Sequence, residues 1–150
     1  MSVRVYIGAD HRGYNLKEVL KIYLKELDYD FEDLGARELN PEDDYPDYAV
    51  EVAKKVAEDL ENNRGVLICV SGVGVDVVAN KFKGIRSALL FNPEQARMSR
   101  NDDNANVLSL SADFIDENSA KEIVKIWLET PFSRLERHVR RVEKIKKIEK

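Results

Sequence analysis

The sequence is poor in cysteine, tryptophan and histidine, with one, one and two residues respectively, and it has no apolar run long enough to cross a membrane. The single cysteine, Cys69, excludes a disulfide within the chain and suits a reducing compartment. The amino-terminal residues contain no signal-type segment. We therefore expect a cytoplasmic protein without membrane contact.

Positive charge is scarce over most of the chain. The net charge is −4 for 150 residues, yet residues 134–150 carry eight basic and three acidic side chains, which leaves −9 on the preceding 133 residues. An acidic body argues against nucleic acid as the main partner. The basic end could bind phosphate or form the solvated face of a helix, and charge alone favours the second interpretation.

Glycine is infrequent, but three of the seven glycines fall in the most informative stretch, residues 65–81. Val66 to Val70 is too short for a helix and rich in β-branched residues, which predicts a strand buried on both faces. Ser71-Gly72-Val73-Gly74 breaks this run, and a helical pattern follows. Glycines permit a tight turn, and the first amides of the helix are left unpaired, so the turn can hold an anion or an oxyanion. The pattern predicts a ligand site without naming the ligand.

Two observations limit this interpretation. The third glycine of the dinucleotide fingerprint is absent, because Val77 occupies its place, so nucleotide binding is disfavoured. A lone cysteine at the end of a buried strand is most often a small core residue. Cys69 and Ser71 would lie at the mouth of the turn, and both interpretations of Cys69 remain open at this point.

Apolar residues make up 43% and charged residues 35% of the sequence, as in a folded domain. The apolar patterns predict strands over residues 3–7, 31–34, 66–70, 85–91 and 106–110. They predict helices after residues 13, 46, 74, 93 and 116, and a last helix over 133–150. This alternation predicts an α/β fold: one three-layer αβα domain over residues 1–150 with a five-stranded, mostly parallel, Rossmann-like sheet.

In such folds ligands bind beyond the carboxyl ends of the strands. Loops at those ends carry Asp10, His11 and Asp44, which places them near Cys69 and Ser71. This convergence favours a functional role for the cysteine.

The last predicted helix, residues 133–150, has a narrow apolar stripe among many charges. Such a helix adds little to its own core, and we expect it to pack on a partner subunit. Arg137 and Arg141 are four residues apart and share a face. Two neighbouring guanidinium groups match a phosphate well.

Seven short motifs, in order along the whole chain, together resemble the sugar-phosphate isomerases of the ribose-5-phosphate isomerase B and galactose-6-phosphate isomerase family. The matching segments are Gly8-Ala-Asp-His-Arg-Gly13, Asp44-Tyr-Pro46, Ile68-Cys-Val-Ser-Gly-Val-Gly74 with Ala79-Asn-Lys81, Gly84-Ile-Arg86, Ala96-Arg-Met-Ser-Arg100, Asn104-Ala-Asn-Val107 and Arg137-His-Val-Arg-Arg141. Each motif alone is weak, but seven in family order are specific.

The resemblance implies interconversion of an aldose phosphate and a ketose phosphate through an enediol. Cys69 would be the base, and Ser71 would move a proton between the two oxygens. A free thiol is mostly protonated at neutral pH, so this role requires the helix start and nearby cations to favour the thiolate. The family resemblance implies that four backbone amides bind the enediolate, those of Gly72, Val73, Gly74 and Val75.

The resemblance also implies which residues bind the sugar and the phosphate of the substrate. Asp10, Asp44 and the neighbouring Tyr45 would bind the sugar, while His11, Arg137 and Arg141 would bind the phosphate. It implies no metal and no organic cofactor. It further implies a homodimer or a tetramer, with the active site shared between subunits.

Three positions depart from the family pattern. Val70 stands where the family usually has a glycine, and Asp113 stands where it often has a phosphate-binding arginine. Asp102 and Asp103 stand where the family has a histidine, credited with opening the sugar ring, followed by asparagine. Asp102 is therefore a candidate proton relay in place of that histidine, and Asp103 a candidate substrate-binding residue.

The default hypothesis is an isomerase for ribose 5-phosphate and ribulose 5-phosphate, in carbohydrate metabolism. The alternatives are an isomerase for another pentose or hexose phosphate, or a diverged sugar-phosphate-binding protein of the same fold without turnover.

Overall fold

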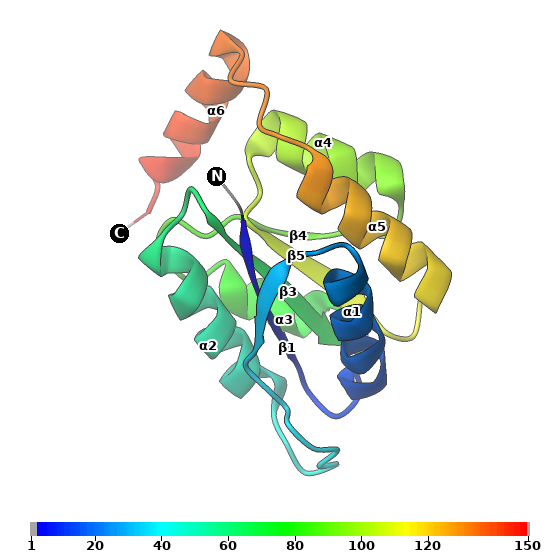
Figure 1. Ribbon diagram of the computed structural model, residues 1–150. Helices are drawn as coiled ribbons and strands as arrows, with labels where there is room; N and C mark the ends of the chain where they lie inside the picture. The colour runs from blue at the N-terminus through cyan, green and yellow to red at the C-terminus, as the bar shows by residue number, and fades with distance from the viewer. Residues whose placement is uncertain (1–2, 150) are drawn as a thin grey trace.

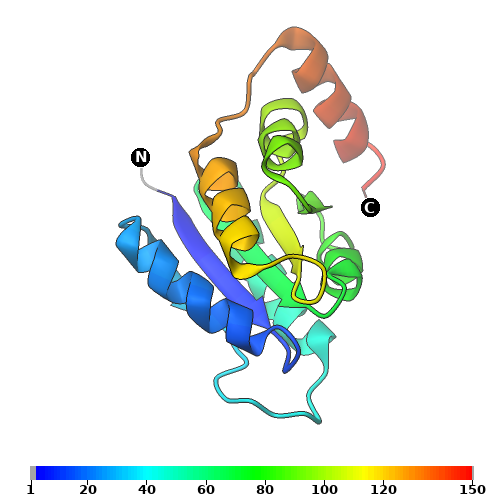
Figure 2. The ribbon, with the colours of Figure 1, turned by 90° about the vertical axis from the view of Figure 1, so that its right-hand side faces the viewer.

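The computed structural model describes residues 3–149 and contains one sheet of five parallel strands in the order β2-β1-β3-β5-β4. Helices flank both faces of this sheet (Figure 1, Figure 2). The strands are β1 (Arg4–Ala9), β2 (Asp30–Asp33), β3 (Asn63–Cys69), β4 (Ser87–Leu89) and β5 (Val107–Ser111). The helices are α1 (Tyr14–Glu26), α2 (Tyr45–Glu58), α3 (Val73–Ala79), α4 (Pro93–Asp103), α5 (Glu117–Glu129) and α6 (Glu136–Lys146). The predicted three-layer α/β fold is confirmed.

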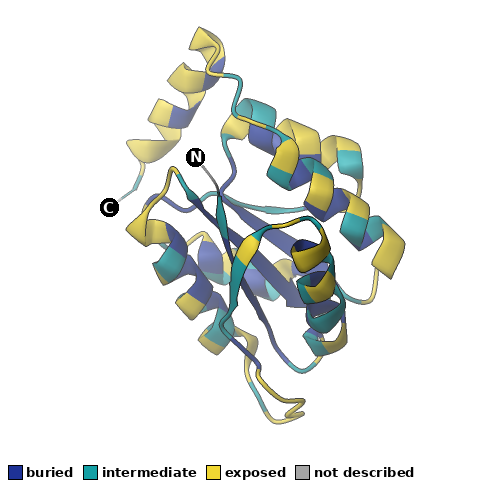
Figure 3. Cartoon of the chain, viewed as in Figure 1, coloured by how far each residue is buried: buried dark blue, intermediate teal, exposed yellow. Residues whose placement is uncertain are grey.

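Two hydrophobic cores fill the space between the sheet and its helix layers. Because successive side chains of a strand point to opposite faces, β3 contributes Val66 and Ile68 to one core and Leu67 and Cys69 to the other. The first core also holds buried residues of α1, α4 and α5, and the second holds those of α2 and α3. All of β3 is buried, at the centre of the molecule (Figure 3). Cys69 thus belongs to the face covered by α2 and α3.

Several element boundaries differ from the sequence prediction. β3 begins at Asn63 because this residue already pairs with Arg4 of β1. The strand predicted over 85–91 shortens to β4, residues 87–89, and the helix predicted after residue 93 runs to Asp103. α6 starts at Glu136, three residues later than predicted, because Arg134 has a left-handed backbone conformation (φ 58°) that no helix can continue.

α6 lies beyond the amino ends of the strands and packs on α4 (Figure 1). Its buried residues are His138 and Val142, and most of its surface is exposed (Figure 3). Beyond the helix, the Glu149 carboxylate accepts a hydrogen bond from the Gly84 amide at 3.0 Å, which ties the end of the chain to the loop before β4. Within residues 3–149 no helix is both long and apolar enough to span a bilayer.

Candidate active site

The candidate site lies at the carboxyl ends of β1 and β3. The helix that follows β1 covers one face of the sheet, and the helix that follows β3 covers the other. This is the switch point of an open α/β sheet, where ligands generally bind. The loop after β1 lies directly on the end of β3, because a Cβ added to Gly13 would be 2.7 Å from the Ile68 carbonyl oxygen. This contact brings the two glycine-containing loops of the sequence together.

The turn between β3 and α3 has the predicted geometry. Gly72 precedes α3 with a left-handed φ of 78°, and a Cβ there would overlap Leu89 and lie 3.0 Å from the Leu110 carbonyl oxygen. The Ser71 hydroxyl accepts a hydrogen bond from the Val73 amide at 3.2 Å. A Cβ on Gly74 would be 2.5 Å from the Tyr45 ring, so the start of α2 lies against the turn. The turn is a compact set of backbone amides at a helix start.

Cys69 is the last residue of β3 and is 3% exposed. Its carbonyl accepts the Ala112 amide of the neighbouring loop at 3.0 Å. The structure therefore places the cysteine below the turn and within the core, as expected for the end of a buried strand. Ser71, two residues later, is partly exposed in the turn itself.

The loop after β1 is organised by carboxylates. One Asp10 oxygen accepts hydrogen bonds from the amides of Arg12 (3.0 Å) and Gly13 (3.1 Å), and the residue is 5% exposed. His11 contacts Asp43 through its ring: Nδ1 lies 2.7 Å from an Asp43 oxygen, which also accepts the His11 amide at 3.0 Å. Asp43 thus fixes the ring of His11 through Nδ1, and Nε2 is the ring nitrogen that Asp43 does not contact.

Asp43 is a functional candidate that the sequence reasoning missed. Its second oxygen accepts the Tyr48 hydroxyl at 3.1 Å, and burial together with this carboxylate raises the pKa of Tyr48. The predicted Asp44 is instead exposed at the start of α2, where its side chain makes no capping hydrogen bond to the described residues. The two aspartates are adjacent in the sequence, and a pattern of residue types does not tell which one turns inward.

A divalent cation would find three ligands here. One ligand atom from each of Asp10, His11 and Asp43 lies within 4.8 Å of the others. The direct contact between His11 and Asp43 already satisfies two of these groups, and it accounts for the arrangement without a metal.

The other predicted residues lie at the opposite edge of the sheet. Asp102 and Asp103 end α4, immediately before the chain enters the amino end of β5, and Arg137 and Arg141 are exposed on α6. Asp102 contacts His138, with 3.8 Å between the carboxylate oxygen and Nε2. Within one chain, these four residues are therefore not brought to Cys69.

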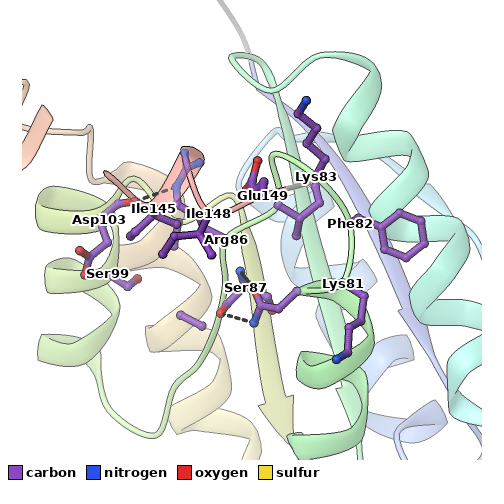
Figure 4. Close-up of a pocket in the computed structure, with 14 residues that line it drawn as sticks. Lys81, Phe82, Lys83, Arg86, Ser87, Ser99, Asp103, Ile145, Ile148 and Glu149 are labelled. Atoms are coloured by element: carbon purple, nitrogen blue, oxygen red, sulfur yellow. Dashed lines mark hydrogen bonds between the residues drawn. The ribbon is translucent and has the colours of Figure 1, made fainter. Parts of the chain in front are cut away.

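A cavity of about 740 Å³ lies at this amino edge as well. Figure 4 shows Arg86, Asp103 and Ile145 on one side of it and Lys81 and Phe82 on the other. The cavity therefore lies beside the end of α4 and not at the Cys69 turn.

Three buried or half-buried arginines shape the amino edge. Arg64, Arg86 and Arg100 donate to carbonyls where α2, α4 and α5 end, those of Leu60, Glu61, Asp103, Asn104, Ala105 and Thr130. Helix carboxyl ends carry unpaired carbonyls and partial negative charge, so guanidinium groups are suitable partners. Burial and the neighbouring arginines lower the pKa of Arg100 to about 9, which leaves it charged at neutral pH. These contacts fix the segment that carries Asp102 and Asp103.

Comparison with known proteins adds to this geometry. The family model for ribose/galactose isomerases matches residues 5–145. The chain belongs to this isomerase family. The family resemblance drawn from the seven motifs is thereby confirmed.

Individual relatives cover nearly the whole chain. The probable ribose-5-phosphate isomerase B of Mycoplasma genitalium is 41% identical over 150 residues, which is 100% of this chain and 98% of that protein. The putative sugar phosphate isomerase YwlF of Bacillus subtilis is 39% identical over 95% of both chains. Among solved structures, the M. genitalium isomerase with bound ribulose-5-phosphate has a TM-score of 0.95 and 40% identity, covering 99% of this chain and 97% of that one.

Proposed function

We propose that the protein is an aldose–ketose isomerase that interconverts ribose 5-phosphate and ribulose 5-phosphate. The observation that carries this proposal is the similarity over almost the full length to an isomerase solved with ribulose-5-phosphate. The strand–glycine–helix turn, with its backbone amides and nearby thiol, provides the groups that this reaction needs.

In the proposed mechanism the Cys69 thiolate removes the proton from C2 of the open-chain aldose and returns it to C1. The proton on O2 moves to O1 through the Ser71 hydroxyl, whose oxygen is held by the Val73 amide. The enediolate oxygen accepts hydrogen bonds from the amides of Gly72, Gly74 and Val75, because the Val73 amide already holds Ser71; one such donor is typically worth about 3–4 kcal/mol. Because Cys69 lies under the turn, the substrate would approach it between the turn and the loop after β1.

The same proposal says which residues bind the sugar and the phosphate. Asp10 and the start of α2 at Asp44 and Tyr45 face the sugar. His11 lies with Nδ1 against Asp43 and binds a phosphate oxygen through Nε2. Asp43 supports this role because it fixes the orientation of the ring.

We further propose a homodimer in which each subunit completes the site of the other. Asp102, Asp103, Arg137 and Arg141 lie at the amino edge, so they serve a Cys69 turn only if it belongs to a second copy. α6 supports this arrangement, since it exposes apolar side chains on a helix that packs mainly on α4; these are Val139 (38%), Ile145 (38%) and, just beyond it, Ile148 (78%). The base must remain a free thiol, which fits action in the reducing cytoplasm.

The reaction is tested by incubating the protein with ribose 5-phosphate in deuterated water and following both sugars by NMR. We expect ribulose 5-phosphate to form, with deuterium entering next to the carbonyl. Binding of ribose 5-phosphate by a folded protein without turnover or exchange would instead favour the sugar-phosphate-binding alternative.

The shared site is tested by mixing two variants, Cys69→Ala and the double variant Arg137→Ala/Arg141→Ala. If each site takes Cys69 from one subunit and the arginines from the other, a mixed dimer has one intact site. Random exchange then restores roughly one quarter of the wild-type activity from two poorly active proteins. Light scattering provides the control that both variants are dimers, and exchange without recovery of activity would refute the shared site.

A further inference from the structure

An ion pair crosses the carboxyl end of β3, above Cys69. The Arg12 guanidinium lies 3.6 Å from the Asp113 carboxylate. Arg12 follows β1 and Asp113 follows β5, and these two strands lie on either side of β3. A contact between their loops therefore has to pass over the end of the central strand.

The β5 side of this pair is firmly anchored. The Asp113 amide donates to the Val70 carbonyl at 3.2 Å, next to Cys69 in the sequence. The Ser111 hydroxyl donates to the same carbonyl at 2.7 Å. The backbone of Arg12 is anchored too, because its amide donates to Asp10. The two backbones are fixed, and the guanidinium at the end of the Arg12 side chain is the movable part.

The ion pair itself is weak. The side chains of Arg12 and Asp113 are 54% and 51% exposed, and an exposed pair at this distance contributes little to stability. Both residues line a cavity of about 400 Å³ between the starts of α1 and α5. The guanidinium can therefore leave Asp113 at small cost and has open space beside it.

The charges around Arg12 give it a further role. The loops at this edge carry the carboxylates of Asp10, Asp43, Asp44 and Asp113, which repel a phosphate dianion. Arg12 is adjacent to His11 on the loop after β1, and a guanidinium can bind two phosphate oxygens at once.

We propose that Arg12 binds the phosphate group of the substrate and that Asp113 competes with this phosphate in the free enzyme. Arg12 exchanges one anion for another: it leaves the Asp113 carboxylate when a sugar phosphate enters and returns when the product leaves. Arg12 is then a substrate-binding residue, and Asp113 is a competing anion that weakens phosphate affinity. This inference rests on the proposed isomerase function for its substrate.

The experiment compares Arg12→Gln and Asp113→Asn in steady-state kinetics and in calorimetric titration with inorganic phosphate. Arg12→Gln should raise KM for ribose 5-phosphate and Kd for phosphate about 10- to 100-fold, the range for losing a charged hydrogen bond, with a small change in kcat. Asp113→Asn should lower both constants by up to about fivefold, since it removes an exposed competing pair. Arg4→Gln is the matched control, because Arg4 forms exposed ion pairs at the amino end of β1 and should change neither constant.

The outcomes separate this inference from the proposed function. An inactive wild-type protein would defeat the isomerase proposal, while the phosphate titration still tests Arg12. Unchanged KM and phosphate affinity in Arg12→Gln would overturn the inference, as would a loss confined to kcat. A raised KM in Asp113→Asn would contradict competition, because it would mean that Asp113 holds Arg12 in its binding position. Thermal melts confirm that each variant is folded.

Discussion

The turn before α3 gives a prediction whose size follows from the structure. Replacing Gly72 by alanine places a Cβ on a backbone with φ 78°, which costs about 1–2 kcal/mol. The same Cβ overlaps Leu89 and lies 3.0 Å from backbone atoms of Leu110, and such crowding in a packed core costs about 1–3 kcal/mol. Gly72→Ala should therefore reduce the free energy of unfolding by roughly 2–5 kcal/mol.

Gly84→Ala is the matched control. Gly84 has a similar φ of 85°, but its added Cβ would meet only side-chain atoms of Leu60, the nearest at 2.8 Å. A side chain end can move, so we expect a loss of about 1–2 kcal/mol from the backbone conformation alone. The two variants separate the cost of the left-handed conformation from the cost of crowding.

Urea unfolding and isomerase kinetics together test this reasoning. For a chain of this length, the Gly72→Ala loss corresponds to a fall in Tm of roughly 5–15 °C. Moving the amides should also lower kcat at least about 100-fold, whereas Gly84→Ala should leave kcat little changed. Equal destabilisation by both substitutions would refute the crowding argument, and a destabilised Gly72→Ala protein with normal kcat would show that the turn does not hold the reacting oxygen.

Three further predictions concern single side chains. Burial raises the pKa of Asp76, on α3, above its unfolded value, so the stability that this group contributes is complete at low pH and is lost as pH rises through the folded pKa. Asp76→Asn should therefore raise Tm at pH 7, and thermal melts in which the same gain in Tm persists at pH 3 would contradict the raised pKa. Asp43→Asn removes the charge that holds His11, so KM for ribose 5-phosphate should rise about tenfold with a smaller change in kcat, and an unchanged KM in steady-state assays would exclude this role. Arg100→Met leaves the carbonyls of Thr130 and Ala105 without their donor and should lower the free energy of unfolding by about 1–3 kcal/mol; an unchanged urea midpoint would show that these bonds contribute nothing net.

The fold was predictable because its signals are local. Val66 to Cys69 is a continuous apolar run, and the glycines after it interrupt the strand where a tight turn is required. A helix is predicted after residue 116, and the Asp116 side chain caps it by accepting the Ser119 amide at 2.7 Å. Features of this kind depend on a few neighbouring residues, so a sequence pattern identifies them.

The site was only partly predictable because it depends on contacts between distant segments. The choice of Asp43 over Asp44 is set by how one loop meets His11, and nothing in the pair of residues decides it. The burial of Cys69 follows from packing under α2 and α3. The position of Asp102 had a usable signal, however, since a residue between a helix and the next strand lies at the amino edge of a parallel sheet.

Cys69 as the proton-transferring base is the central claim, and deuterium exchange in Cys69→Ala tests it most directly. The substitution removes one buried sulfur and should leave a folded protein, as circular dichroism and binding of inorganic phosphate would confirm. We predict that incorporation of deuterium beside the carbonyl of ribose 5-phosphate falls at least about 1000-fold while phosphate binding persists. Exchange at a rate near that of the wild type would contradict the account, because another group would then have to remove the proton.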